Sequence, residues 1–318
     1  MQAFLNGEYM DLADAKVNVM THALNYGTGV FEGIRAYWDD EEEQLLLFRV
    51  REHFERMHQS ARILRIGINY SVDELVEICV NVLRAGKFRE DVYVRPLAFK
   101  SALQVGLNMV AMGPDGLRPI ENGFTLFALP FGNYLDIEKP IRCTISAWRR
   151  VNDNMIPARG KVTGIYVNSS LAKTEALESG FDEAIMLTHD GHVSEGSGEN
   201  LFIVRHGKLL TPSLSEDILE GVTRATVMQI ALDDLGIETI ERPIDRTELY
   251  IADELFLVGT GAQISPVREI DGRIIGDGEI GTVTGALQDL YFDIVRGRSA
   301  KYREWCLSVQ ERAAAPHA

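Results

Sequence analysis

The chain has 318 residues, 46% of them hydrophobic and 25% charged, which is typical of a globular protein with room for two domains. Its net charge of -15 argues against nucleic acid or a membrane as a partner, and no apolar run approaches the roughly 18 residues that span a bilayer. Three scattered cysteines argue against disulfides and a metal site, and the absence of a signal-peptide pattern at the start predicts a cytoplasmic protein.

The first part of the chain predicts two helices and three strands. Apolar periodicity predicts a helix from Glu52 to Leu64 and another from Ser71 to Ala85, which Ser71 and Glu74 begin with a capping box. The Gly- and Pro-rich residues 112–123 predict a mobile loop. Strands are predicted at 46–48, 92–100 and 124–129.

The second part alternates strands, turns and helices. Strands are predicted at 141–148, 184–187, 201–204, 209–211 and 254–258, and helices at 169–178, 221–235 and 281–296. This mixture, which lacks a regular βαβ array, predicts a mixed α/β (α+β) fold. We expect a small α/β domain over 1–130, an interdomain linker over 131–139, a large domain over 140–308 and a disordered tail over 309–318.

The stretch from Lys161 to Phe202 contains two residue types that pyridoxal phosphate requires. A lysine can form a Schiff base, and a carboxylate can keep the pyridine nitrogen protonated. Lys161 opens the stretch in a Gly-containing turn before Tyr166, and two carboxylates close it, at Glu195 and Glu199. From the residues alone, a solvated lysine and an ordinary polar turn stay open as alternatives.

Two segments and one arginine are candidates for binding an anion. Residues 219–223 begin a predicted helix, so its N–H groups and the Thr223 hydroxyl can hold a phosphate. Arg56 can supply a charge partner, and residues 259–261 offer amides and the Thr260 hydroxyl after a buried strand. An ordinary helix start, a surface arginine and a plain loop are the alternatives.

Aromatic and cationic residues of the first part suggest a substrate pocket. Tyr26, Phe31 and Tyr93 are candidates, although aromatic residues near strands belong more often to a core. Strand alternation puts Tyr93 and Arg95 on one face, where an arginine beside a tyrosine suits a carboxylate.

Together these residues resemble the class IV pyridoxal-phosphate-dependent aminotransferases, and within them the branched-chain amino acid aminotransferases. The resemblance covers nearly the whole length and rests on several motifs in the family's order. These are NYGTGVFEGIRAY at 25–37, FRVREHFERMHQSA at 48–61, YVRP at 93–96, the Lys161 segment, SEGSGENLF at 194–202, ILEGVTR at 218–224 and GTGAQISPV at 259–267. One departure is Ile165, where the family often has a small polar residue.

The resemblance implies a fold, a cofactor and a role for each matching residue. The fold is the two-domain fold-type IV architecture with a barrel-like sheet in the larger domain, and the family's site implies a homodimer or larger assembly. Lys161 would be the catalytic Schiff-base lysine. The implied ligands of pyridoxal 5'-phosphate are Arg56, Lys161, Tyr166, Glu195, Leu219, Val222, Thr223 and Thr260. The implied substrate residues are Tyr26, Phe31, Arg35, Tyr93, Arg95, Thr260 and Gly261.

The implied activity is a ping-pong transfer of the amino group from L-leucine, L-isoleucine or L-valine to 2-oxoglutarate. The first alternatives share the fold: a D-amino acid aminotransferase, an (R)-amine transaminase or an aminodeoxychorismate lyase. A non-catalytic pyridoxal-phosphate-binding protein is an alternative from another class, which intact Lys161, Glu195 and Tyr166 argue against.

Overall fold

The computed structural model describes residues 2–310, which divide into two compact units. Unit 1 comprises Met1–Gly132, Gly160–Gly164 and Asp293–Ala318, and unit 2 comprises Asn133–Arg159 and Ile165–Phe292. The expected tail lies outside the described residues from position 311 onward. Within the described part, no helix is both long enough and apolar enough to cross a membrane.

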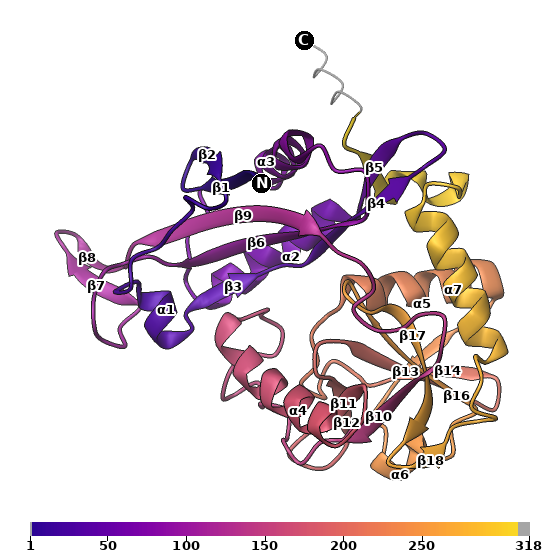
Figure 1. Cartoon of the computed structure of the whole chain (residues 1–318). Helices are drawn as coiled ribbons and strands as arrows, with labels where there is room; N and C mark the ends of the chain where they lie inside the picture. Colours follow the sequence, from indigo (N-terminus) through magenta and orange to yellow (C-terminus); the bar gives the residue numbers. More distant parts are fainter. Residues whose placement is uncertain (1, 311–318) are drawn as a thin grey trace. The chain divides into compact units, whose positions relative to one another are not determined.

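Unit 1 is built on an eight-stranded antiparallel sheet (Figure 1). The strand order is β19-β5-β4-β6-β9-β1-β2, and β3 pairs with β6. The strands of this sheet are β1 (Gln2–Leu5), β2 (Glu8–Asp11), β3 (Gly29–Phe31), β4 (Ile34–Asp39), β5 (Gln44–Phe48), β6 (Val92–Lys100), β9 (Asn122–Pro130) and β19 (Cys306–Ser308).

The described part of unit 1 contains the two predicted helices and two short ones that the sequence did not predict. These are α1 (His22–Tyr26), α2 (Val50–Ile63), α3 (Val72–Gly86) and the 3-10 helix η2 (Ala300–Trp305). The predicted capping box of α3 is confirmed, because the Glu74 amide donates to Ser71 Oγ and the Ser71 amide donates to Glu74 Oε2. Leu75 and Cys79 are fully buried on the face of α3 that contacts β1 and β9.

The mobile loop expected at 112–123 is not what the structure has there. Residues Val110–Gly113 and Gly116–Pro119 form the hairpin strands β7 and β8, with Gly113 opposite Gly116. Gly116 has φ +110°, a conformation that side chains disfavour, so a glycine there permits the short turn at Pro114 and Asp115. The Gly and Pro content that suggested a loop therefore marks a tight turn between two strands.

Unit 2 contains a nine-stranded mixed sheet that curls into a half-barrel (Figure 1). The order is β12-β11-β10-β17-β16-β13-β14-β15, with β18 on β17, and the pairs β10/β11, β10/β17 and β14/β15 are parallel. The strands are β10 (Ile141–Ile145), β11 (Glu183–Leu187), β12 (Val193–Gly196), β13 (Asn200–Arg205), β14 (Lys208–Thr211), β15 (Thr239–Glu241), β16 (Glu254–Gly259), β17 (Gln263–Ile270) and β18 (Arg273–Ile274).

Four helices and one 3-10 turn accompany this sheet. The helices are α4 (Tyr166–Glu178), α5 (Val222–Leu235), α6 (Arg246–Leu249) and α7 (Thr282–Val295), and the turn is η1 (Thr163–Ile165), whose first two residues belong to unit 1. One core cluster of unit 2 is formed by apolar residues of the curled sheet, such as Ile203, Leu257 and Ile270, which are fully buried. The mixture of parallel and antiparallel strands with helices confirms the predicted mixed α/β class.

Candidate active site

Lys161 is held by the backbone of unit 1. Its carbonyl oxygen accepts a hydrogen bond from the Phe31 amide at 3.1 Å, and its own amide donates to Ser60 Oγ at 3.1 Å. The next residue, Val162, forms a β-bridge with Val30. The Lys161 Nζ lies 5.1 Å from the centre of the Phe31 ring, and the side chain is half-buried. These contacts fix the lysine, in contrast to the solvated surface lysine that the sequence left open.

Phe31, Tyr93 and Arg95 lie together in the same unit. The Arg95 guanidinium stands 4.6 Å from the centre of the Phe31 ring and donates to the Tyr93 hydroxyl at 3.1 Å. Tyr93 and Arg95 share the half-buried face of β6, as strand alternation predicts. A Cβ on Gly33 would lie 2.0 Å from the Tyr93 hydroxyl, so the glycine at that position gives the ring its place.

Arg56 forms a buried ion pair with Glu32. Its Nε and Nη2 each donate to the Glu32 carboxylate at 2.7 Å, and His53 Nδ1 lies 2.8 Å from Glu32 Oε2. Burial alone would raise the pKa of Glu32, but the Arg56 charge and the hydrogen bonds from His53 and Arg56 hold it far below the usual value. Glu32 is therefore ionised and fixes the orientation of the Arg56 fork.

His53 is neutral beside this pair. Burial lowers the pKa of His53, and the positive charges of Arg56 and Lys161 lower it further, although Glu32 opposes them. The ring nitrogen that faces the Glu32 carboxylate must carry the proton, since a carboxylate only accepts hydrogen bonds. Glu32 and His53 were not singled out from the sequence, although Glu32 stands inside the motif at 25–37.

The remaining candidates of unit 1 occupy two different places. The Tyr26 hydroxyl accepts from the Gly106 amide at 3.0 Å, so Tyr26 and the loop at 105–107 lie together. Arg35 is 2% exposed, donates to the Gly132 carbonyl and lies 5.1 Å from the centre of the Phe131 ring. Arg35 is thus part of the packed interior between β4 and the end of β9.

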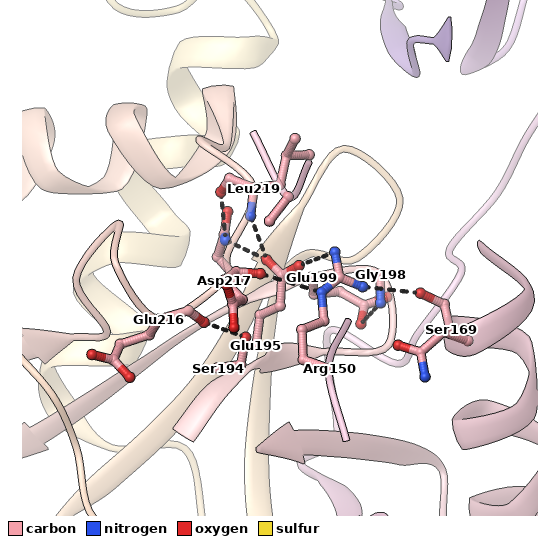
Figure 2. A network of polar contacts seen from close by, with 12 residues as sticks. Arg150, Ser169, Ser194, Glu195, Gly198, Glu199, Glu216, Asp217 and Leu219 are labelled. Atoms are coloured by element: carbon pink, nitrogen blue, oxygen red, sulfur yellow. Dashed lines mark hydrogen bonds and ion pairs between the residues drawn. The ribbon is translucent and has the colours of Figure 1, made fainter. Parts of the chain in front are cut away.

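In unit 2, Glu195 is a buried carboxylate held by donors on both oxygens (Figure 2). Its Oε1 lies 2.7 Å from Arg150 Nη2. Its Oε2 accepts from Asn200 Nδ2 at 2.9 Å and from the Leu219 amide at 3.1 Å. A cation and two N–H groups favour the ionised form, which is the form that can pair with a protonated pyridine nitrogen.

Arg150 is the residue of this network that the sequence did not reveal. It is 7% exposed, and besides Glu195 it reaches the Asp217 carbonyl and Ser169 Oγ, each at 3.3 Å (Figure 2). The only sequence signal is its position just after the strand predicted at 141–148. Whether Arg150 pairs with Glu195 depends on how the chain folds between the two positions, and no local pattern in the sequence predicts this.

The start of α5 is joined to the Glu195 network through one amide. Asn200 Nδ2 donates both to Glu195 and to the Leu219 carbonyl, the latter at 2.9 Å. A Cβ on Gly221, the residue before the helix, would lie 2.0 Å from Asn200 Oδ1. Val222 and Thr223 are buried in the first turn, where helix N–H groups favour an anion.

The other candidates of unit 2 lie at element ends. Tyr166 is the first residue of α4 and is half-buried, while Ile165 before it is buried. Thr260 and Gly261 connect β16 to β17, and a Cβ on Gly261 would lie 3.6 Å from the Tyr134 side chain. No group of three or more His, Cys, Asp or Glu side chains among residues 2–310 is arranged to hold a metal ion.

The donor set fits pyridoxal phosphate. The cofactor has an aldehyde, a basic ring nitrogen and a phosphate, which call for an amine, a carboxylate and anion-binding groups. Unit 1 offers the Lys161 amine and the Arg56 fork, and unit 2 offers the buried Glu195 and the start of α5. Gly221 leaves room for the Asn200 amide, which in turn holds the Glu195 carboxylate.

Comparison with known proteins points the same way. Residues 29–270 match the family described as amino-transferase class IV. The chain is 49% identical to the probable branched-chain-amino-acid aminotransferase of Aquifex aeolicus over 98% of this chain and 97% of that protein. The crystal structure of branched-chain aminotransferase from Thermoproteus uzoniensis with norvaline matches with a TM-score of 0.90 at 46% identity, over 97% of this chain and 99% of that one.

A third similar protein is a crystal structure described as a holo-form. The crystal structure of branched-chain amino acid aminotransferase from Thermobaculum terrenum in its PLP-form matches with a TM-score of 0.88 at 35% identity, over 98% of this chain and 98% of that one. These likenesses confirm the resemblance seen in the sequence, the fold-type IV architecture and the enzyme class. The chain belongs to the class IV aminotransferases.

Proposed function

We propose that the protein is a pyridoxal-phosphate-dependent branched-chain amino acid aminotransferase, which transfers the amino group of L-leucine, L-isoleucine or L-valine to 2-oxoglutarate. The observation that carries the proposal is the buried Glu195 carboxylate with its three donors, in a chain whose relatives are branched-chain aminotransferases. Such a carboxylate suits a protonated pyridine nitrogen. When bound, the cofactor supplies an aldehyde that takes up the amino group and a ring that accepts electrons from the α-carbon.

Each cofactor ligand has a proposed part. Lys161 holds the aldehyde carbon through Nζ, Glu195 faces the ring nitrogen and Tyr166 hydrogen-bonds the phenolic oxygen. Leu219 packs on the ring. The phosphate ligands are Arg56, Val222, Thr223 and Thr260. The first turn of α5 supports this assignment with its N–H groups, and Glu32 supports it by fixing the Arg56 fork.

Lys161 is proposed as the proton carrier of both half-reactions. Its Nζ would take the proton from the substrate α-carbon and would return it to the carbon that the bound cofactor contributes. The hydrogen bonds at the Lys161 carbonyl and amide fix the backbone from which the side chain moves. The Phe31 ring near Nζ supports this by keeping one side of the amine apolar.

The substrate pocket is proposed from two groups of residues. Phe31, Tyr26 and Tyr93 shape the apolar part, and Arg95 orders the strand face that carries Tyr93. Tyr93, Thr260 and Gly261 bind the substrate carboxylate. Arg35 belongs to the same set, and its burial assigns it a supporting contribution through Phe131 and Tyr37.

A homodimer or larger homo-oligomer is part of the proposal. Unit 1 exposes apolar side chains near α1 and on residues 103–117, which a second copy would cover. They are Val19, Leu24, Leu103, Val105, Leu107, Met112 and Leu117. Replacing Val105, which is 85% exposed, by Asp would then dissociate the assembly, as measured by light scattering after size-exclusion chromatography. An unchanged mass would contradict this assignment of the face.

The proposed location is the cytoplasm. The three cysteines, Cys79, Cys143 and Cys306, are unpaired and buried. Unpaired thiols are usual in a reducing compartment, and this supports the location. Fluorescence microscopy of the tagged full chain in a bacterial host would test it.

The test of function is a half-reaction followed by the absorbance of the bound cofactor. The loaded protein is mixed with L-leucine, D-alanine or (R)-1-phenylethylamine. A fast spectral change with L-leucine alone is expected, and a faster change with either of the others would move the protein to a sister activity. Lys161→Ala should abolish turnover, whereas Lys208→Ala, at an exposed lysine of β14, should not. Turnover retained in the first variant would reject the assignment of Lys161.

A further inference from the structure

A second carboxylate, that of Glu199, is buried close to Glu195 in unit 2. Glu199 is 5% exposed and stands just before β13, after the glycine turn at 196–198. Its Oε2 accepts a hydrogen bond from the Gly198 amide at 3.1 Å (Figure 2). The proposed transfer has no part for this side chain.

The groups that surround Glu199 contain more acidic than basic side chains. Glu183 on β11 is fully buried, and its Oε2 accepts from Lys173 Nζ on α4 at 2.6 Å. Lys173 also donates to the Asp182 carbonyl, so this cation is already engaged. Glu195 on β12 is paired with Arg150. Ionising both Glu183 and Glu199 would leave excess negative charge in a buried region, which is costly.

The pKa shifts of these groups are consistent with the excess of acidic side chains around Glu199. Burial raises the pKa of Glu199 to about 8, and the charges of Glu183 and Glu195 add to the effect, against the Gly198 amide and Lys173. Burial likewise raises the pKa of the Cys143 thiol on β10 and of Tyr134, and the negative charge of Glu183 raises both further. At pH 7 Glu199 therefore retains its proton.

Glu199 and Tyr134 lie behind the loop that connects β16 to β17. A Cβ on Gly259 would be 3.7 Å from Glu199 Cγ, which is ordinary packing distance. A Cβ on Gly261 would be 3.6 Å from the Tyr134 side chain, and the Lys173 Nζ stands 5.1 Å from the centre of the Tyr134 ring. Both glycines that flank Thr260 thus pack against the group of ionisable side chains around Glu199.

We propose that Glu199 is kept as a neutral carboxylic acid behind the Gly259–Gly261 loop, and that this neutrality lets the loop bind an anion. The inference rests on the proposed function, in which Thr260 and Gly261 bind the cofactor phosphate and the substrate carboxylate. Ionisation of Glu199 places a negative charge beside the loop. The loop residues 259–261 are half-buried, and at such a place a like charge a few ångströms away repels an anion.

Sulfate is a suitable probe because its charge is constant between pH 7 and pH 9. Its dissociation constant is measured by calorimetry on the full chain freed of cofactor, for the wild type and for Glu199→Gln, which keeps the shape but does not ionise. We expect the wild-type dissociation constant to rise about fivefold more than that of the variant over this pH range. An equal rise in both proteins overturns the inference.

The protonated acid can also be observed directly by infrared difference spectroscopy. The wild type should show a carboxylic acid C=O band that titrates with a midpoint near pH 8 and is missing in Glu199→Gln. Glu183→Gln removes one repelling charge, so it should lower the midpoint. This second variant keeps the test valid if the first does not fold.

The outcomes separate the inference from the proposed function. If the band is absent at pH 7 in a protein that turns over L-leucine, the inference alone is wrong. If the band is present but sulfate does not bind the wild type at either pH, the anion-binding role of the loop is wrong and the inference falls with it.

Discussion

Arg150 Nη2 lies 2.7 Å from Glu195 Oε1, and both side chains are at least nine-tenths buried. The same guanidinium contacts the Asp217 carbonyl and Ser169 Oγ, so it joins β12 to the segment before Leu219 and to α4. The carboxylate that we assign to the pyridine nitrogen therefore has a fixed position and a fixed counter-charge.

Arg150→Met should lower the free energy of unfolding by about 3–5 kcal/mol, because it leaves a buried carboxylate without its cation. It should also reduce kcat, since the Glu195 carboxylate loses its orientation. Arg150→Lys keeps the charge but not the fork, so it should recover part of both quantities. Urea denaturation and steady-state kinetics measure the two effects, and a methionine variant with wild-type values would contradict this account.

Glu32→Gln should weaken cofactor binding through the phosphate. The change leaves the buried Arg56 without a counter-charge, at a cost of about 3 kcal/mol in stability. Calorimetry with pyridoxal phosphate should show the loss, whereas pyridoxal, which has no phosphate, should bind with unchanged affinity. Equal losses for both ligands would mean that Glu32 acts on the fold and not on Arg56.

The same variant predicts a pH dependence. The folded pKa of Glu32 is depressed, so its stabilising contribution is present above the ordinary value of 4.5 and is lost as the pH falls below it. The difference in stability between wild type and Glu32→Gln should therefore shrink below about pH 4.5. A difference that stays constant down to pH 3 would contradict the conclusion that Glu32 is ionised in the folded protein.

His53 should make the protein less stable in mild acid. Its folded pKa lies below the ordinary value of 6.5, so the unfolded chain binds the proton more readily and stability falls as the pH drops through 6.5. The loss is at most about 1.4 kcal/mol per pH unit. His53→Gln should flatten the melting temperature between pH 7.5 and 5.5, while His189→Gln, at an exposed histidine, should not.

Gly221→Ala should disturb the Glu195 network without straining the backbone. Gly221 has φ -70°, which alanine accepts, but its Cβ would lie 2.0 Å from Asn200 Oδ1. Asn200 must then move away from Glu195 and Leu219, and cofactor affinity should fall by at least about tenfold, the equivalent of one charge-assisted hydrogen bond. Gly198→Ala is the matched control, because a Cβ there meets nothing within 4 Å.

The sequence predicted the features that depend only on residues close together along the chain. The capping box of α3 and the end of α5 at Gly236 follow from local chemistry, and the structure has both. It did not predict pairs that the fold brings together, such as Glu32 with Arg56 or Arg150 with Glu195. Glu32 and Arg150, the two members that were missed, look like ordinary surface residues until their partners are known. The hairpin β7/β8 was missed although its residues are close along the chain. The Gly and Pro residues in it suggested a loop, and each strand is only four residues long.

The single amide of Asn200 imposes a rule on how this protein can change over evolutionary time. A side chain at position 221 would displace the Asn200 amide, and a smaller residue at position 200 would lose the same hydrogen bonds to Glu195 and Leu219. Either substitution made first weakens the hydrogen bonds that hold Glu195, so selection for a firmly held carboxylate acts on both positions. Asn200 and Gly221 should therefore be inherited together in descendants that keep the carboxylate at position 195.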